Sequence, residues 1–215
     1  MLCVQQGQSV KELEIVHKVP DIVSLRKEDV EVAGEILEQA FAEDPLNVYT
    51  APDPSRRRSL FRWLFTRLVR MADTTYTTAE QIRGVALWVA PQSGEVVEGD
   101  VDDLEQMERI FGPEAYQRFS RAFDYFEDRH RQHMQGPHWY LQLLGVAPRW
   151  QGQGFGTALM APALRQADRQ GFPCYLETFV AANVPFYQRH GFQVVAAGEE
   201  PRSHIPFWSM RREPR

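Results

Sequence analysis

Three alternate glycines in the second half of the chain constrain its fold most strongly. They lie in the segment Gln151-Gly152-Gln153-Gly154-Phe155-Gly156-Thr157, after the apolar run Trp139 to Val146 and before a stretch of helical composition, Thr157 to Gln170. Glycine permits positive φ and lets the backbone approach a ligand closely. The first N–H groups of a helix are unpaired, and the helix dipole favours an anion beside them. A strand, a glycine-rich turn and a helix in this order predict a pyrophosphate-binding site.

The spacing of the glycines separates the known kinds of phosphate loop. A P-loop requires a lysine directly after its last glycine, and no lysine follows Gly156. A dinucleotide fingerprint, G-x-G-x-x-G, follows its strand directly. Here Thr157 stands at the third glycine position, and Ala147 to Gln151 separate the glycines from the strand. Glu177 lies at about the distance expected of a ribose-binding acid, so this second alternative stays open.

A second motif follows further along the chain, from Asn183 to Phe192. Asn183 stands where a helix N-cap is expected, Pro185 lies in the first turn that tolerates proline, and Gly191 stands just past the predicted end. The pattern predicts a short helix followed by a strand that begins at Phe192. A further strand, Cys174 to Thr178, is predicted between the two motifs.

Length, charge and cysteine content limit the classes of protein that fit. The chain has 215 residues, a net charge of −5 and 43% hydrophobic residues, which suits one globular domain. The negative charge argues against nucleic acid as the main partner and mildly favours an amine-bearing substrate. Two cysteines, Cys3 and Cys174, argue against a disulfide framework. With no predicted signal peptide or membrane span, we expect a cytoplasmic protein.

The remaining pattern divides the chain into a polar lead-in, residues 1 to 18, and a single domain, residues 19 to 215. Hydrophobic periodicity and turn residues predict the other elements. These are a strand at Ile22–Leu25, a helix at Val30–Ala42 that Asp44-Pro45 ends, a loop at Leu46–Pro54, a helix capped by Ser55, a hairpin of Thr74–Thr78 and Ile82–Ala90, helices at Asp102–Phe111 and Glu114–His130 separated by Gly112-Pro113, and a last strand at Ile205–Met210.

Together the two motifs resemble those of the GNAT superfamily of N-acetyltransferases. Gln151, Gly154 and Gly156 fit its Gln/Arg-x-x-Gly-x-Gly/Ala loop, and Phe186-Tyr187 fits its second element. The pattern is most similar to that of puromycin N-acetyltransferase-like proteins, over residues 22 to 212. The resemblance implies an α/β (α+β) fold. It would have a mixed central sheet, helices on both faces, and a splayed pair of strands that binds the cofactor.

The resemblance also implies the cofactor and the residues that hold it. Acetyl-CoA would pair its pantetheine arm with the backbone of Leu144 and Val146, as an added strand does. N–H groups of the glycine loop would hold the pyrophosphate; these belong to Gln151, Gly152, Gln153, Gly154, Phe155, Gly156 and Thr157. Asn183 would contact the pantetheine or cap the following helix. No metal is expected.

The implied reaction is direct attack of an amine on the thioester. Tyr187 is the candidate general acid, because a phenol is protonated at neutral pH and can donate to the leaving thiolate. Glu177 is the candidate general base, with His138, His204 or water as alternatives. The acceptor would be a primary amine of a small molecule, bound between residues 44–52 and 119–126. A non-catalytic acetyl-CoA-binding or sensory module is the alternative function, and a homodimer stays open.

Overall fold

The computed structural model describes residues 20–72, 74–91 and 101–215, so the predicted lead-in lies outside it. Its strands form one sheet with the order β1-β2-β3-β4-β5-β7-β6. Neighbouring strands pair antiparallel, apart from β4 and β5, which pair parallel. The strands are β1 (Ile22–Ser24), β2 (Thr74–Thr78), β3 (Gly84–Val89), β4 (Trp139–Val146), β5 (Cys174–Thr178), β6 (Gln193–Glu199) and β7 (Pro206–Arg212). The predicted mixed sheet is confirmed.

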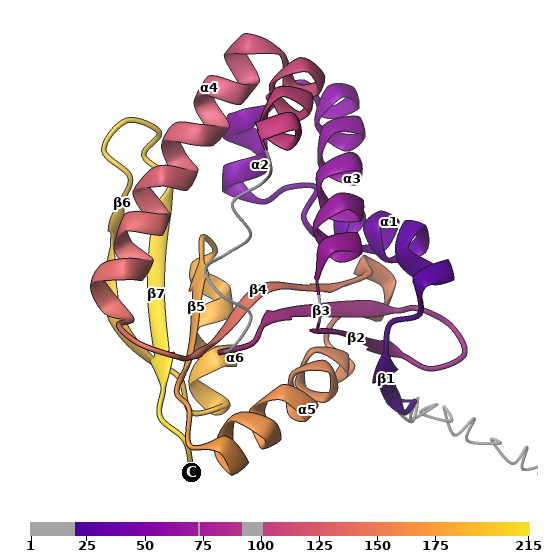
Figure 1. The fold of residues 1–215 in the computed structure, drawn as a ribbon, viewed down its shortest axis with the longest axis vertical. Coiled ribbons are helices and arrows are strands. Elements are labelled where there is room, and N and C mark those ends of the chain that lie inside the picture. The colour runs from indigo at the N-terminus through magenta and orange to yellow at the C-terminus, as the bar shows by residue number, and fades with distance from the viewer. Residues whose placement is uncertain (1–19, 73, 92–100) are drawn as a thin grey trace, which may run out of the picture.

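Helices cover both faces of this sheet, as predicted (Figure 1). Alternate residues of β3 show the two faces, because Val85 and Leu87 pack against one set of helices and Ala86 and Trp88 against the other. The first face carries α1 (Val30–Ala40), α2 (Pro45–Thr50), α3 (Pro54–Met71) and α4 (Val101–His133), and the second carries α5 (Phe155–Gln170) and α6 (Val184–Arg189). Short 3-10 helices, η1 (Lys27–Asp29), η2 (Pro148–Trp150) and η3 (Ala181–Asn183), join these elements.

A bulge in β4 separates the two halves of the sheet. The pairing with β3 shifts register between Leu87 and Trp88, whose partners are Leu143 and Leu141, so Gln142 has no partner on β3. Such an extra residue bends the strand that carries it. β4 pairs with β5 only over its first two residues, and the strands then diverge (Figure 1). The predicted splay of the two strands is therefore present, and it follows a bulge.

The segment Leu46–Pro54 is not the loop that was predicted, because it contains α2. The Asp44 carboxylate accepts a hydrogen bond from the Leu46 N–H at 3.0 Å, and Pro45 occupies the first turn of the helix. An acidic cap followed by proline is a helix start signal. Asp44-Pro45 therefore marks the beginning of a helix as well as the end of the preceding one.

Two further predictions concern helix boundaries. Ser55 does not cap α3; the carboxylate of Asp53 does, by accepting the Arg56 N–H at 2.8 Å, and Ser55 donates its hydroxyl to the same carboxylate at 2.6 Å. The predicted break at Gly112-Pro113 is confirmed as a kink inside α4, where Gly112 has φ 69° and ψ 163°. Glycine adopts this conformation without steric cost.

The ion pair between Asp168 of α5 and Arg212 of β7 ties the second helix layer to the sheet. The Arg212 side chain is 4% exposed, and it donates to both carboxylate oxygens at 2.7 and 2.8 Å. We expect Asp168→Ala to lower the free energy of unfolding by about 3 kcal/mol, since it leaves a buried guanidinium unpaired. Urea unfolding measures this loss.

A matched surface pair serves as the control for this measurement. Arg211 and Glu213 are exposed and lie 2.7 Å apart, so Glu213→Ala should cost less than about 0.5 kcal/mol. Replacing Arg212 by Met in the Asp168→Ala background should recover part of the loss. Equal effects at Asp168 and Glu213 would contradict the structural role given to the buried pair.

Candidate acetyl-transfer site

The free edge of β4 faces the opening between β4 and β5. The Ala147 N–H donates to the Arg83 carbonyl oxygen at 2.9 Å, so the backbone groups of Ala147 point toward β3. Because alternate residues of a strand bond to the same neighbour, the backbone groups of Gly145 also point toward β3. The N–H and C=O groups of Leu144 and Val146 therefore point the other way, toward the side from which β5 has diverged. These are the residues predicted to pair with a pantetheine arm.

The glycine turn begins where this strand ends. Gly152 and Gly154 have φ of 72° and 86°, the left-handed conformation that favours glycine, and Gly154 is the residue just before α5. The Gln151 amide donates from Nε2 to the Val146 carbonyl oxygen at 3.0 Å, which fixes the turn to the strand. α5 begins at Phe155, two residues earlier than predicted, so the helix dipole and its first N–H groups point at the turn.

The start of α5, the end of β4 and α6 meet at Gly156. A Cβ atom there would lie 3.1 Å from the Phe186 ring and 4.0 Å from the Leu144 side chain. His190 bridges the same elements, since its Nδ1–H donates to the Phe186 carbonyl oxygen at 2.8 Å and its Nε2 accepts from the Thr157 hydroxyl at 3.1 Å. The structure thus brings the two sequence motifs into contact.

Tyr187 lies on α6 and is 8% exposed. Burial raises the pKa of its phenol, and the negative charge of Asp44 raises it further. Asp44 itself belongs to the opposite helix layer, where burial raises the pKa of its carboxyl to about 6 against the hydrogen bonds of the α2 backbone. Two groups from opposite faces of the sheet therefore interact near the point where β4 and β5 separate.

Glu177 lies on the opposite face of β5 from Tyr187. Its neighbour Leu176 belongs to the same core cluster as Tyr187, and successive side chains of a strand point to opposite faces. Tyr175 shares the face of Glu177, and its ring stacks on His130 near the C-terminal end of α4. The two predicted catalytic residues therefore flank the opening from opposite sides of the sheet.

The surroundings of Glu177 determine its protonation. Burial raises the pKa of its carboxyl to about 8, the phenols of Tyr175 and Tyr140 oppose this rise, and the negative charge of Glu127 on α4 adds to it. The Oε1 atom is buried and makes no hydrogen bond of normal geometry. A carboxyl with this pKa is mainly protonated at pH 7 and becomes a base as the pH rises through 8.

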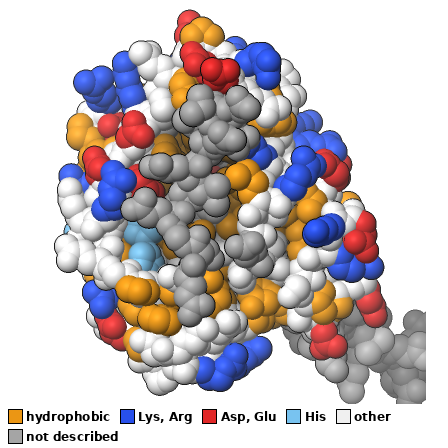
Figure 2. Space-filling model, viewed as in Figure 1, with side chains coloured by type: hydrophobic (Ala, Val, Ile, Leu, Met, Phe, Trp, Pro, Cys, Tyr) orange, Lys and Arg blue, Asp and Glu red, His pale blue; other side chains and the backbone are white. Residues whose placement is uncertain are grey.

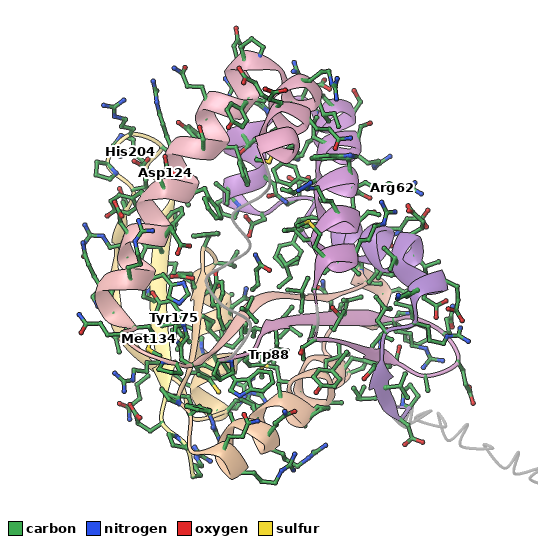
Figure 3. The ribbon with its side chains drawn as sticks, in the orientation of Figure 1. Arg62, Trp88, Asp124, Met134, Tyr175 and His204 are labelled. Atoms are coloured by element: carbon green, nitrogen blue, oxygen red, sulfur yellow. The ribbon has the colours of Figure 1, made fainter. Side chains whose placement is uncertain are left out.

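The two alternative bases lie in different places. His138 is hydrogen-bonded to His130 of α4 at 2.7 Å, within the group of residues around Tyr175 and Tyr140. His204 lies in the turn before β7 with its side chain 77% exposed, and its Nδ1 lies 3.6 Å from the carboxylate of Glu199. Figure 3 shows His204 well away from Tyr175. Of the two histidines, the structure brings only His138 toward Glu177.

Other predictions about the site have mixed outcomes. Asn183 does not cap α6; its Nδ2 donates to the Thr178 hydroxyl at 3.2 Å and so ties η3 to the end of β5. α2 packs against α4. Phe119 and Phe126 are buried core residues, whereas Phe123 is exposed.

The sequence did not reveal the group around Glu177. Tyr140 and Tyr175 are adjacent in the parallel register of β4 and β5, and His130 of α4 packs against both rings. The alternation on each strand could have shown that Tyr175 and Glu177 share a face. The contact with His130 depends on the packing of α4, which no local pattern encodes.

Two classes of site have no support among the described residues. No group of three or more His, Cys, Asp or Glu side chains there could hold a metal ion. Within residues 20–72, 74–91 and 101–215, no helix is both long and apolar enough to cross a membrane. Acidic and basic side chains alternate over the face in Figure 2, which fits a modest net charge.

The fold and the open strand pair define an acyltransferase architecture, and comparison with known proteins gives its family. Residues 114–192 match the family model described as Acetyltransferase (GNAT) family. A Schizosaccharomyces pombe protein named as an uncharacterized N-acetyltransferase is 25% identical over 211 residues, covering 86% of this chain and 80% of the relative. Residues 114–192 are thus similar to GNAT acetyltransferases, and the protein is an acetyltransferase.

Three solved structures share the fold at low identity. A Corynebacterium glutamicum protein described as histone acetyltransferase HPA2 and related acetyltransferase has TM-score 0.70 and 23% identity, over 92% of this chain and 98% of that one. A Drosophila melanogaster polyamine N-acetyltransferase has TM-score 0.63 and 14% identity, over 90% and 100%. The Thermoplasma acidophilum PaiA N-acetyltransferase, solved with coenzyme A, has TM-score 0.53 and 13% identity, over 90% and 98%.

The sheet also decides between the two kinds of phosphate loop left open by the sequence. A dinucleotide-binding fold requires a parallel sheet, whereas here β4 and β5 are the one parallel pair among the described strands. The reading of Glu177 as a ribose-binding acid is therefore wrong. The glycine turn belongs to a GNAT domain.

The raised pKa of Glu177 makes stability depend on pH in a defined direction. In the folded state the Glu177 carboxyl has a pKa of about 8, whereas in the unfolded state it has the ordinary value of 4.5. The folded state therefore binds this proton more tightly, and the free energy of unfolding falls as the pH rises from 4.5 to 8. Glu177→Gln removes the effect. We expect the variant to gain more than about 1 kcal/mol relative to the parent protein between pH 5 and pH 8.5.

Thermal unfolding of the two proteins across this pH range measures the gain. Glu199→Gln is the control, because Glu199 is exposed and its substitution should change stability equally at all pH values. A pH-independent difference between Glu177→Gln and the parent protein would show that Glu177 is ionised throughout.

Proposed function

We propose that the protein transfers the acetyl group of acetyl-CoA to a primary amine of a small molecule. The observation that carries this proposal is the β4 edge at Leu144 and Val146, which has no strand partner on that side and leads directly into the Gly152–Gly154 turn and the start of α5. An extended pantetheine arm can add to a strand edge, and a pyrophosphate suits the N-terminus of a helix. Acetyl-CoA contains both groups in this order, and it is the ligand that GNAT domains use.

Tyr187 is proposed as the general acid. The amine attacks the thioester carbonyl, a tetrahedral intermediate forms, and its C–S bond breaks to release the thiolate of CoA. Because burial and Asp44 both raise the pKa of the Tyr187 phenol, the group is protonated at neutral pH and can donate its hydrogen to the leaving thiolate. Backbone N–H groups between Leu144 and Val146 would stabilise the oxyanion.

Glu177 is proposed as the general base that removes the proton from the attacking nitrogen, directly or through water. Its pKa of about 8 is close to the pH at which most enzymes work, which is favourable for proton transfer. Pantetheine threaded between β4 and β5 would present the thioester between the two faces of the sheet. Tyr187 could then act on sulfur from one face while Glu177 acts on nitrogen from the other.

The acidic lining favours a cationic acceptor. Asp44 raises the pKa of Tyr187, and Glu127 of α4 raises the pKa of Glu177, so each proposed catalytic group has an acidic neighbour. Negative charge in a partly buried site attracts an ammonium group. The polyamine N-acetyltransferase of the same fold acts on small amines of this kind and forms N-acetylagmatine, which makes agmatine and diamines the first acceptors to examine.

Acetyl-CoA should stabilise the protein, and NAD should not. At about one hundred times its dissociation constant, a ligand specific for the native state adds roughly 2.7 kcal/mol. Gly154→Ala should remove most of this gain, because φ of 86° strains alanine at the start of α5. Gly136→Ala is the matched control, with φ of 81°, open space around the new Cβ and a position remote from α5.

Thermal unfolding with and without each nucleotide provides this measurement. Both alanine variants should lose about 1–2 kcal/mol without ligand, and only Gly136→Ala should keep the response to acetyl-CoA. A response to NAD alone, or none to acetyl-CoA, would refute the cofactor assignment. Acetyl-CoA binding without turnover over a broad amine panel would instead favour a sensory module.

Tyr187→Phe tests the proposed acid. The change keeps the ring that packs against Phe186 and Phe192 and removes only the hydroxyl. We expect kcat to fall by about 10²–10⁴, as for loss of a general acid, with little change in the KM for acetyl-CoA. The rate is measured from the release of the CoA thiol. Tyr116→Phe on α4 is the control, and an unchanged kcat in Tyr187→Phe would exclude the assigned role.

A further inference from the structure

His130 and His138 form a hydrogen-bonded pair whose tautomers can be assigned. Their Nε2 atoms lie 2.7 Å apart, and His138 Nδ1 lies 2.8 Å from the Gly136 carbonyl oxygen. A carbonyl oxygen only accepts, so His138 Nδ1 carries the hydrogen and the neutral ring has a lone pair on Nε2. His130 must then donate from Nε2, which leaves the lone pair of His130 on Nδ1.

This Nδ1 atom is a buried hydrogen-bond acceptor without a partner. His130 is 6% exposed, and its Nδ1 makes no hydrogen bond. Burial, and to a lesser extent the neighbouring His138 and Arg131, lower the pKa of His130 to about 4, so the ring stays neutral. A buried acceptor without a hydrogen bond costs free energy. Because buried polar groups nearly always have a hydrogen-bond partner, this atom calls for a partner that provides a donor.

His130 packs against the two tyrosines whose phenols act on the proposed base. The ring stacks on Tyr175 at 4.5 Å with an interplanar angle of 11°, and it lies 4.4 Å from the ring of Tyr140. The phenols of these two tyrosines act on Glu177. Three further buried atoms of this group, Tyr175 Oη, Glu177 Oε1 and Ser209 Oγ, interact with one another but make no hydrogen bond of normal geometry. Ser209 pairs with Glu177 in the sheet register.

The chemistry of these atoms identifies what they can bind. Glu177 Oε1 and His130 Nδ1 are acceptors, and the phenol oxygen of Tyr175 can accept as well. A primary ammonium offers three N–H donors and no acceptor. We propose that His130 Nδ1, together with Glu177 and Tyr175, receives the N–H bonds of the acceptor nitrogen, so that His130 selects aliphatic primary amines.

This inference rests on the proposed function and adds two residues to it. His130 would accept one N–H bond of the substrate nitrogen. Another N–H bond of the same nitrogen would then point toward the base, Glu177. His138 would be a positioning residue, because it acts through His130: its Nε2 lone pair holds the His130 hydrogen on Nε2 and keeps Nδ1 free to accept. Glu127 adds negative charge to the same site.

The tautomers and the contact can be measured without turnover. In full-length protein labelled with ¹⁵N-histidine, two-bond ¹H–¹⁵N correlation spectra report which ring nitrogen carries hydrogen, and His130→Asn assigns the signals. We expect a bare Nδ1 in His130, with a shift toward the hydrogen-bonded range on addition of butane-1,4-diamine, agmatine or 2-phenylethylamine in the presence of CoA. Butane-1,4-diol is the matched control without an ammonium group.

Several outcomes of this measurement would overturn the proposal. They are a hydrogen on His130 Nδ1, an unchanged Nδ1 signal with all three amines, and an equal shift with the diol, which would indicate an internal water as the partner. Because the readout is independent of acetyl transfer, an enzyme that acetylates none of these amines would refute the proposed function while the spectra still decide this inference.

Kinetics provides the second test. His130→Leu removes the acceptor, whereas His130→Asn keeps an oxygen that can accept near the position of Nδ1. We expect the leucine variant to raise the KM for the amine about tenfold or more, as for loss of a hydrogen bond to a charged group, and to leave the KM for acetyl-CoA unchanged. In the asparagine variant, the KM for the amine should return most of the way to that of the parent protein. An unchanged amine KM in a folded His130→Leu protein would overturn the inference.

Discussion

The extra residue at Gln142 changes the direction of β4, and the site depends on that change. Beyond the bulge, β4 no longer pairs with β5, so the backbone of Leu144 and Val146 has no strand partner on that side. These groups lie at the edge of the opening, next to the glycine turn. An unpaired edge inside a sheet is normally unfavourable, and a ligand that pairs with it offsets this cost.

The same opening allows groups from the two helix layers to interact through the sheet. Asp44 comes from the layer of α1 to α4 and affects the pKa of Tyr187 in the layer of α5 and α6. Arg57 helps to fix Asp44, because its buried guanidinium donates to the carbonyl oxygens of Ala42 and Ala51 on both sides of α2. Burial is the main cause of the raised pKa at Asp44, Glu177 and Tyr187, so the packing that forms the site also adjusts its acid–base chemistry.

Local sequence signals predicted the elements well where the chemistry of single residues decides them. Glycines with positive φ mark the turn at Gly152 and Gly154 and the kink at Gly112. The predictions failed where two signals compete. Asp44-Pro45 serves as a helix start, and Asp53 caps α3 in place of Ser55, because a carboxylate directly before proline forms a better cap than the hydroxyl that follows it. Asn183 stands at a cap position, yet Thr178 accepts its side-chain N–H.

The sequence by itself determined the order of strand, glycine turn, helix and second motif, since these depend on backbone freedom and hydrophobic periodicity within short segments. It also determined that Tyr175 and Glu177 share one face of β5, because that follows from the alternation of side chains. Only the tertiary structure decided that α4 places His130 over Tyr175, that His138 orients that ring, and that Asp44 lies near Tyr187. These contacts join segments far apart in the chain, so they depend on how helices and sheet pack, and burial at those contacts sets the pKa values on which the proposed chemistry depends.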